Sequence, residues 1–161
     1  MNVEGVVALL RDHGSTVATA ESLTGGLVAA TLIEVPGASD VVRGGVVAYA
    51  PDIKTGVLGV PEDLVATRGT VDEATARSMA ERARIVCSAT YGVATTGVAG
   101  PDSSEGKPAG TVHIAVAGPA GASHRLLSLV GDRQQIRSGT VAAVLDLLVA
   151  KVREESDDDR R

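Results

Sequence analysis

The chain has 161 residues, of which 44% are hydrophobic, so it can fold around one substantial core. It has no Phe or Trp and only two Tyr, and therefore lacks the aromatic side chains on which proteins stack single-stranded nucleic acid. The formal net charge of −5 at pH 7 also disfavours binding to a phosphate backbone, so we expect no nucleic-acid partner.

Targeting and redox signals are weak. No apolar run approaches the roughly 20 residues of a membrane-spanning helix. The N-terminus lacks the charged and apolar regions of a signal peptide. The single cysteine, Cys87, excludes an intrachain disulfide and is expected to be small core filler. We therefore expect a cytoplasmic protein with no membrane partner.

The first third of the chain predicts two helices and two strands. An amphipathic helical stripe opens the chain: Val3, Val6, Val7 and Leu10. A strand over 16–20 follows, and a second helix extends to about Glu34. The apolar run 41–49 predicts a buried strand, after which Pro51 begins a short helix that carries Lys54.

The middle of the chain predicts two more helices and a strand. Pro61 marks a helix start, and Asp72 is a suitable N-cap for a helix that extends to Cys87. A strand over 91–96 leads into a long loop at 97–110, which is rich in glycine and proline.

The last third predicts a hairpin and a long helix. The strand 111–117 alternates in polarity, so its two faces should differ, and a turn at 118–121 connects it to a partner strand over 125–130. Asp132 and Gln135 have the spacing of a capping box. An apolar stripe follows with helical spacing: Val141, Val144, Leu145, Leu148 and Val152.

This order of elements predicts an α/β fold. We expect three layers, α/β/α, with a mixed, mostly parallel sheet of about five strands. Residues 1–153 should form a single domain, and the charged segment 154–161 should be a disordered tail.

The stretch 19–26 is the first candidate for a functional site. A β-branched strand ends there in Ser22, Thr24, Gly25 and Gly26, and a helix then begins. The first turn of a helix offers unpaired N–H groups and partial positive charge, so it can hold a phosphate or an oxyanion. The alternative is an ordinary helix cap and turn. Walker-A chemistry is disfavoured because no Gly-Lys-Ser/Thr motif occurs.

Lysine is the second candidate. The chain has twelve Arg and only three Lys. Of these two residue types, only lysine can lose its proton in a protein. Lys151 should lie on the solvated face of the last helix. Lys54 follows Tyr49 by about one turn, so it should approach Ser22 if the two strands are parallel neighbours. A Ser-His-Asp triad and a metal site have little support, because the three His are separated and the cysteine is alone.

Two further clusters follow predicted strands or open a helix. The segment 95–102 combines hydroxyl and glycine residues, although it could simply be a mobile surface loop. Arg133 and Arg137 lie one turn apart and could hold a phosphate, although a solvated basic face is the commoner arrangement.

Together these clusters resemble the CinA C-terminal domain family over roughly residues 3–152. The motifs that carry the resemblance are Ala20-Glu21-Ser22-Leu23-Thr24-Gly25-Gly26, Arg43-Gly44-Gly45-Val46-Val47-Ala48-Tyr49 with Lys54, the segments 97–102 and 107–112, and Gly131-Asp132-Arg133. The family's characterised members are nicotinamide-nucleotide amidases of the PncC type. The likeness is to the stand-alone form of the family.

The resemblance implies hydrolysis of the carboxamide of nicotinamide mononucleotide, giving nicotinic acid mononucleotide and ammonia, without metal or cofactor. By motif, Ser22 would be the nucleophile, Lys54 the general base, and Tyr49 a proton-relay or orienting partner, with Thr96 as a further site hydroxyl. Substrate-binding positions would be Glu21, Thr24, Gly25, Gly26, Gly97, Gly100, Arg133 and Arg137. The resemblance also implies a homodimer or a larger homo-oligomer.

The chain departs from the family pattern at three places. Leu23 stands where the family commonly has Cys, Asp72 where it has Ser, and the loop 102–106 lacks the usual glycine pair after its aspartate. Two other functions stay open at this point: a catalytically silent nucleotide-binding regulatory module, and a Ser/Lys hydrolase that acts on another amide or ester.

Overall fold

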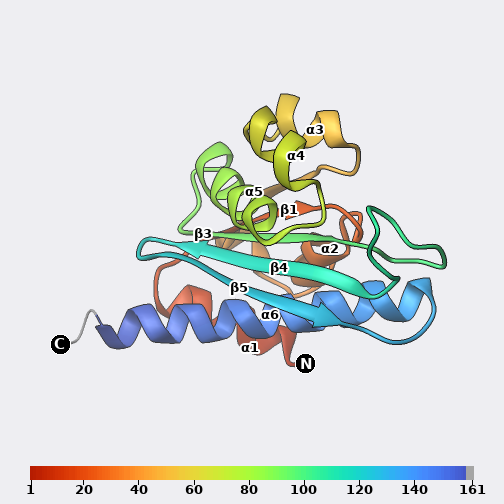
Figure 1. The fold of residues 1–161 in the computed structure, drawn as a ribbon. Coiled ribbons are helices and arrows are strands. Elements are labelled where there is room, and N and C mark those ends of the chain that lie inside the picture. The colour runs from red at the N-terminus through yellow and green to blue at the C-terminus, as the bar shows by residue number, and fades with distance from the viewer. Residues whose placement is uncertain (159–161) are drawn as a thin grey trace.

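A five-stranded sheet with helices on both faces organises residues 1–158, the residues that this computed structural model describes (Figure 1). The strands are β1 (Val17–Glu21), β2 (Val42–Val47), β3 (Tyr91–Gly97), β4 (Thr111–Gly118) and β5 (Gly121–Ser128). The helices are α1 (Val3–Asp12), α2 (Leu27–Ile33), α3 (Pro51–Gly56), α4 (Glu62–Arg68), α5 (Glu73–Val86) and α6 (Arg133–Asp158), with a 3₁₀ turn, η1 (Ala38–Asp40).

The strands have the order β2-β1-β3-β4-β5. The first three are parallel, whereas β4 is antiparallel to both β3 and β5, so four strands share one direction. The predicted α/β fold with a mixed sheet is confirmed. Because β1 has β2 and β3 as parallel neighbours, the carboxyl ends of these three strands meet at one edge of the sheet.

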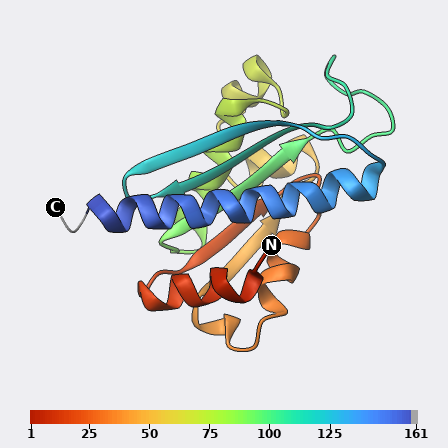
Figure 2. The same cartoon turned by 90° about the horizontal axis from the view of Figure 1, so that it is seen from below.

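Two cores of different side-chain size lie on the two faces of the sheet. Helix α5 covers one face through Ala76, Ala80 and Ala83, which pack on sheet alanines such as Ala94 and Ala115. Helices α1, α2 and α6 cover the other face, where the buried side chains are mostly Val, Leu and Ile. Figure 2 shows α6 and α1 lying across this second face. The small residues let the backbone of α5 approach the sheet closely.

Three strand predictions need correction. We expected a buried strand at 41–49, but β2 is an edge strand in which every second residue is exposed. The faces of β4 do not differ in burial, because helices cover both sides and every residue after Thr111 is buried. Strand β5 begins at Gly121, four residues earlier than expected, because Gly118 pairs directly with Gly121 across a two-residue turn.

The last helix is longer than the sequence suggested. Helix α6 continues through Asp158, whereas we expected a disordered tail from residue 154; residues 159–161 lie outside the described part of the chain. Lys151, which we expected to be solvated, is only 7% exposed, and its amine lies 3.1 Å from Glu155. Glu155 also accepts a hydrogen bond from the N–H of Ala120, so these contacts hold the helix end against the β4–β5 turn. No described helix, α6 included, is apolar over enough length to cross a membrane.

The predicted helix caps are present. Asp72 accepts a hydrogen bond from the N–H of Ala74 at 2.8 Å. Asp132 and Gln135 form a reciprocal capping box, in which each side chain accepts from the other residue's N–H at 2.8 Å.

Replacing Gly92 with Ala should strongly destabilise the fold. A Cβ at Gly92 would collide with the carbonyl oxygen of Ala80 and lie 2.9 Å from the N of Arg84, both backbone atoms of α5. We expect Gly92→Ala to lower the free energy of unfolding by at least about 2 kcal/mol in urea titration, because α5 must move off the sheet. The control is Gly56→Ala, where no atom lies within 4 Å of the added Cβ, and whose effect should stay within about 0.5 kcal/mol. Equal stabilities of the two variants would contradict the close approach of α5.

Candidate active site

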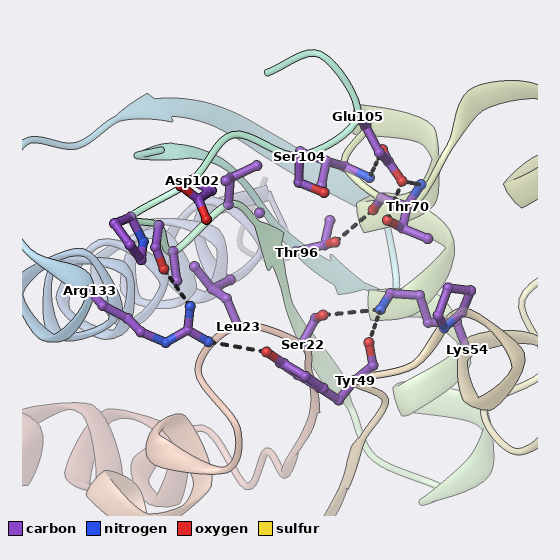
Figure 3. A pocket seen from close by; sticks show the side chains of 17 residues that line it. Ser22, Leu23, Tyr49, Lys54, Thr70, Thr96, Asp102, Ser104, Glu105 and Arg133 are labelled. Atoms are coloured by element: carbon purple, nitrogen blue, oxygen red, sulfur yellow. Dashed lines mark hydrogen bonds between the residues drawn. The ribbon is translucent and has the colours of Figure 1, made fainter. Parts of the chain in front are cut away.

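The carboxyl ends of β1, β2 and β3 open onto a cavity of about 460 Å³, which Figure 3 shows from close by. The residues that line it are Ser22, Leu23, Tyr49, Pro51, Lys54, Thr70, Val71, Thr96, Gly97, Val98, Ala99, Gly100, Pro101, Asp102, Ser104, Glu105 and Arg133. The cavity thus collects residues from five separate parts of the sequence.

Lys54 and Ser22 meet at the floor of this cavity. The Nζ of Lys54 lies 3.0 Å from the Oγ of Ser22, and the two residues are 1% and 8% exposed. Pro51 at the first position of α3 begins a short helix directly after β2, and one turn of that helix places Lys54 beside the end of β1. The sequence predicted this encounter from the parallel arrangement of the two strands.

The remaining partners of Lys54 fix the direction of its lone pair. Its Nζ also donates to the carbonyl oxygens of Ala48, at 2.7 Å, and Tyr49, at 3.2 Å. Carbonyl oxygens can only accept hydrogen bonds. When the amine is neutral, its two hydrogens can serve the two carbonyls, and its lone pair then faces the hydroxyl of Ser22. A neutral Lys54 would therefore direct its lone pair at the Ser22 hydroxyl.

Burial makes a neutral Lys54 accessible near physiological pH. It lowers the pKa of the ammonium from its ordinary 10.5 to about 8, although the negative charge of Glu105 opposes part of this shift. At pH 7 a pKa of about 8 leaves about one molecule in ten with a neutral amine. A buried, partly deprotonated lysine beside a serine is the arrangement of an activated nucleophile.

The turn after Ser22 is held by groups that do not line the cavity. Glu21 is 1% exposed, and its carboxylate accepts from the N–H groups of Val28 and Ala29 at 2.8 and 3.1 Å. Glu21 therefore caps α2 in place of the Ser22 or Thr24 hydroxyl that we expected. Because these N–H groups are occupied, the start of α2 does not form the anion site that the sequence suggested.

Three more predicted binding residues support this turn instead of lining the cavity. The hydroxyl of Thr24 is buried and lies 2.8 Å from that of Thr95. Gly25 and Gly26 have φ values of +59° and +102°, which glycine adopts without strain, and they let the chain turn into α2. These positions therefore shape the turn that presents Ser22.

The two arginines have different roles. Arg137 donates to the carbonyl oxygens of Leu23 and Thr24 at 2.9 and 3.1 Å, so it supports the turn from below and does not line the cavity. Arg133 lines the cavity and donates to the carbonyl oxygen of Gly100 at 2.6 Å. Only Arg133 is placed to meet a ligand in this cavity.

Tyr49 and Thr96 are both at the cavity, with different partners from those expected of a proton relay. The phenol of Tyr49 is hydrogen-bonded by Arg133 at 3.1 Å, and Tyr49 meets Lys54 through its carbonyl oxygen. Thr96 is 1% exposed, and its hydroxyl donates a hydrogen bond to the carbonyl oxygen of Thr70 at 2.6 Å. Because its proton is donated to Thr70, the Thr96 hydroxyl could act toward a ligand in the cavity only as an acceptor.

Sequence reasoning missed Thr70, Ser104 and Glu105 as cavity residues, whereas Asp102 lies in the segment 95–102 that it singled out. Glu105 contacts Thr70 across 35 positions of the sequence, and no local pattern marks such a distant contact. The acidic residue within an otherwise Gly/Pro-rich loop was the one available signal.

The histidines do not line this cavity. No group of three or more His, Cys, Asp or Glu side chains among residues 1–158 is arranged to hold a metal ion. His113 and His124 form a contact of 2.9 Å between β4 and β5, away from the residues that line the cavity, and burial lowers the pKa of both. Ser22 and Lys54 are the hydroxyl and the amine of the cavity that lie in direct contact.

A serine in contact with a buried lysine at the strand ends of a mixed α/β sheet places the protein among candidate hydrolases. The sequence model of the CinA C-terminal domain matches residues 2–152. The chain belongs to this family.

Curated relatives carry the same domain within longer chains. A CinA-like protein of Frankia casuarinae is 51% identical over 148 residues, which cover 91% of this chain and 34% of that protein. A CinA-like protein of Anaeromyxobacter sp. is 49% identical over 146 residues, covering 90% and 36%. This chain therefore spans about a third of the length of these relatives.

Solved structures match the fold over nearly their whole length. The competence/damage inducible protein CihA of Agrobacterium tumefaciens has a TM-score of 0.87 and 38% identity, covering 92% of this chain and 94% of that one. A CinA superfamily protein of Klebsiella pneumoniae has a TM-score of 0.90 and 28% identity, covering 96% and 99%. The recognised family and the observed fold agree.

The structure predicts that the two arginines differ in their effect on stability. Arg137→Met should lower the free energy of unfolding by about 2 kcal/mol, because two carbonyl groups of the Ser22 turn lose a charged donor. Arg133→Met should cost no more than about 1 kcal/mol, since Arg133 is exposed and water can replace it. Urea titration of the two variants measures this difference, and an equal loss would contradict the supporting role of Arg137.

Proposed function

We propose that this protein hydrolyses the carboxamide of nicotinamide mononucleotide to nicotinic acid mononucleotide and ammonia, a step of NAD salvage. The contact of 3.0 Å between the Lys54 amine and the Ser22 hydroxyl carries this proposal. The resemblance to nicotinamide-nucleotide amidases, stated above on the motifs around these residues, supports the choice of substrate.

In the first half of the proposed reaction, neutral Lys54 takes the proton of Ser22 while the Ser22 oxygen attacks the carboxamide carbon. An amide is a weak electrophile, so the developing oxyanion needs donors. We assign the N–H of Leu23 to this role, because Leu23 follows Ser22 and lines the cavity. Lys54 then returns its proton to the leaving nitrogen, and ammonia departs as the C–N bond breaks.

In the second half, water attacks the acyl ester on Ser22. Lys54 accepts a proton from this water and delivers it to the Ser22 oxygen as the ester bond breaks. The Thr96 hydroxyl, as an acceptor, can orient the water or the amide. No cofactor or metal enters this scheme.

Substrate binding is assigned to the residues that line the cavity. Arg133 would hold the phosphate, and Gly97 and Gly100 would shape the wall beside it. Glu21, Thr24, Gly25, Gly26 and Arg137 act on substrate only through the turn that carries Ser22. Binding energy from the remote phosphate can position the carboxamide for attack. Self-association into a homodimer or a larger homo-oligomer stays a prediction of the resemblance.

Removing either reactive side chain should abolish ammonia release. We expect Ser22→Ala and Lys54→Met each to lower kcat/KM for nicotinamide mononucleotide by at least about 1,000-fold, because each removes an obligatory participant. The matched control is Ser138→Ala, an exposed serine on α6, which should match the wild type. Turnover that survives in Ser22→Ala would refute the assignment.

The same assay separates the two other functions. Calorimetric binding of the nucleotide by the wild type without product over hours would favour a silent regulatory module. Turnover of simple esters or other amidated nucleotides in place of nicotinamide mononucleotide would favour a different Ser/Lys hydrolase.

The activity should depend on pH through Lys54. The amine acts as a base only when neutral, and the neutral fraction rises as pH rises through its pKa of about 8. We therefore expect kcat/KM to fall about tenfold per pH unit well below pH 8 and to level off above it. Ammonia release measured from pH 6 to 9.5, over the range in which the fold is intact, tests this profile. A profile that is flat from pH 6 to 9 would argue against Lys54 as the base.

A further inference from the structure

Glu105 joins the 97–110 loop to the segment between α4 and α5. Its Oε1 accepts from the N–H and the hydroxyl of Thr70 at 2.9 and 2.5 Å, and its Oε2 accepts from the N–H of Val71 at 3.0 Å. Gly69 makes room for this contact, because a Cβ there would lie 2.7 Å from Oε2. One carboxylate thus ties down two consecutive backbone positions on the cavity wall.

The loop presents Glu105 through a tight turn. Ser104 and Lys107 exchange two backbone hydrogen bonds, of 3.0 and 2.9 Å, around Glu105 and Gly106. Glu105 has φ +52°, a conformation that costs free energy in a residue other than glycine. The three hydrogen bonds to Thr70 and Val71 offset that cost, so the turn and the contact depend on each other.

A further hydrogen bond links the contact between Glu105 and Thr70 to Thr96. Thr70, which Glu105 holds, accepts the hydrogen bond from the Thr96 hydroxyl at 2.6 Å. Figure 3 shows Glu105, Thr70 and Thr96 in succession along the wall that faces Lys54. Displacement of Thr70 would therefore displace the acceptor that fixes the Thr96 hydroxyl.

We propose that Glu105 is a positioning residue of this site, whose carboxylate locks the 97–110 loop onto Thr70 and Val71 and thereby sets the wall opposite Ser22 and Lys54. The role in turnover rests on the proposed function, whereas the effect on Lys54 does not.

The charge of Glu105 acts on Lys54 across the cavity. It favours the ammonium form and opposes the lowering of the Lys54 pKa by burial. The other charged groups of the cavity wall are Asp102 and Arg133, and Lys107 lies 3.8 Å from Glu105 on the loop itself. Among these, the charge of Glu105 is the one that raises the Lys54 pKa. Its removal should make Lys54 a neutral amine at lower pH.

The three lysines of the chain allow a direct test without substrate. Protein labelled with ¹³C at lysine Cε gives three resonances, and the signal lost in Lys54→Met identifies Lys54. In Glu105→Gln we expect the titration midpoint of Lys54 to move to lower pH than in the wild type. The matched control Asp102→Asn removes a carboxylate from the same cavity and loop and should leave the midpoint in place.

Two companion variants separate charge from positioning. Thr70→Val removes one hydrogen bond to Glu105 but keeps its charge, so thermal stability should fall while the Lys54 midpoint stays. Glu105→Asp keeps the charge on a shorter arm, so its midpoint should lie nearer the wild type than that of Glu105→Gln. If Glu105→Gln does not fold, Glu105→Asp and Thr70→Val must still show lower kcat/KM than the wild type.

Activity gives an independent measure. Glu105→Gln should lower the plateau kcat/KM about tenfold, through the misplaced Thr96, and shift the acidic limb to lower pH. Folded Glu105→Gln that keeps the wild-type thermal stability and plateau kcat/KM would overturn the positioning role, and an unmoved Lys54 midpoint in that variant would overturn the charge effect, even if the wild type releases ammonia. If instead the wild type releases no ammonia but Glu105→Gln is less stable and its Lys54 midpoint moves, the proposed substrate falls and the inference on Glu105 stands.

Discussion

The removal of one ammonium group from water is the constraint on which the site depends. Lys54 is buried against two backbone carbonyls, which can accept hydrogen bonds from its amine but cannot donate any. That environment makes the neutral amine accessible near pH 8 and leaves Ser22 as the partner of its lone pair. The sheet positions Lys54 relative to Ser22. The N–H of Ala48 donates to the carbonyl oxygen of Glu21 at 2.8 Å, so the ends of β2 and β1 stay in register beside these two side chains.

The site separates the groups that face the cavity from the groups that hold its backbone. Glu21, Thr24 and Arg137 form hydrogen bonds that hold the turn that carries Ser22. Each looks like a ligand-binding residue in the sequence: Glu21 and Thr24 are polar and flank Ser22, and Arg137 lies one helical turn from Arg133. Their partners show why a motif cannot make this distinction. A buried polar side chain must find a partner, and a backbone carbonyl or N–H satisfies that need as well as a substrate does.

The same distinction explains how far sequence reasoning reaches. The meeting of Ser22 and Lys54 could be predicted, because strand ends in a parallel sheet share one edge and the two residues follow such ends. The capping of α2 by Glu21 could not, since its side chain reaches seven positions ahead and local cap patterns span two or three. The edge position of β2 was equally hidden, because an apolar run does not reveal how many neighbours a strand has. Lys151 was misplaced for a related reason: its burial depends on Glu155 and on the β4–β5 turn, which lie together only in the folded chain.

Basic side chains lie toward both ends of the cavity, and Ser22 lies at the Lys54 end. Figure 3 shows Lys54 and Ser22 toward one end and Arg133 toward the other. A guanidinium has five N–H donors, and Arg133 uses two contacts, to Gly100 and Tyr49, to bridge the loop and the end of β2. Donors therefore remain for an anion, and Arg133 can bind it without losing its contacts to Gly100 and Tyr49. An anion bound there would hold the loop and the end of β2 together. The Arg133 end thus offers an anion-binding group apart from Ser22 and Lys54, which is the arrangement that the proposed nucleotide substrate requires.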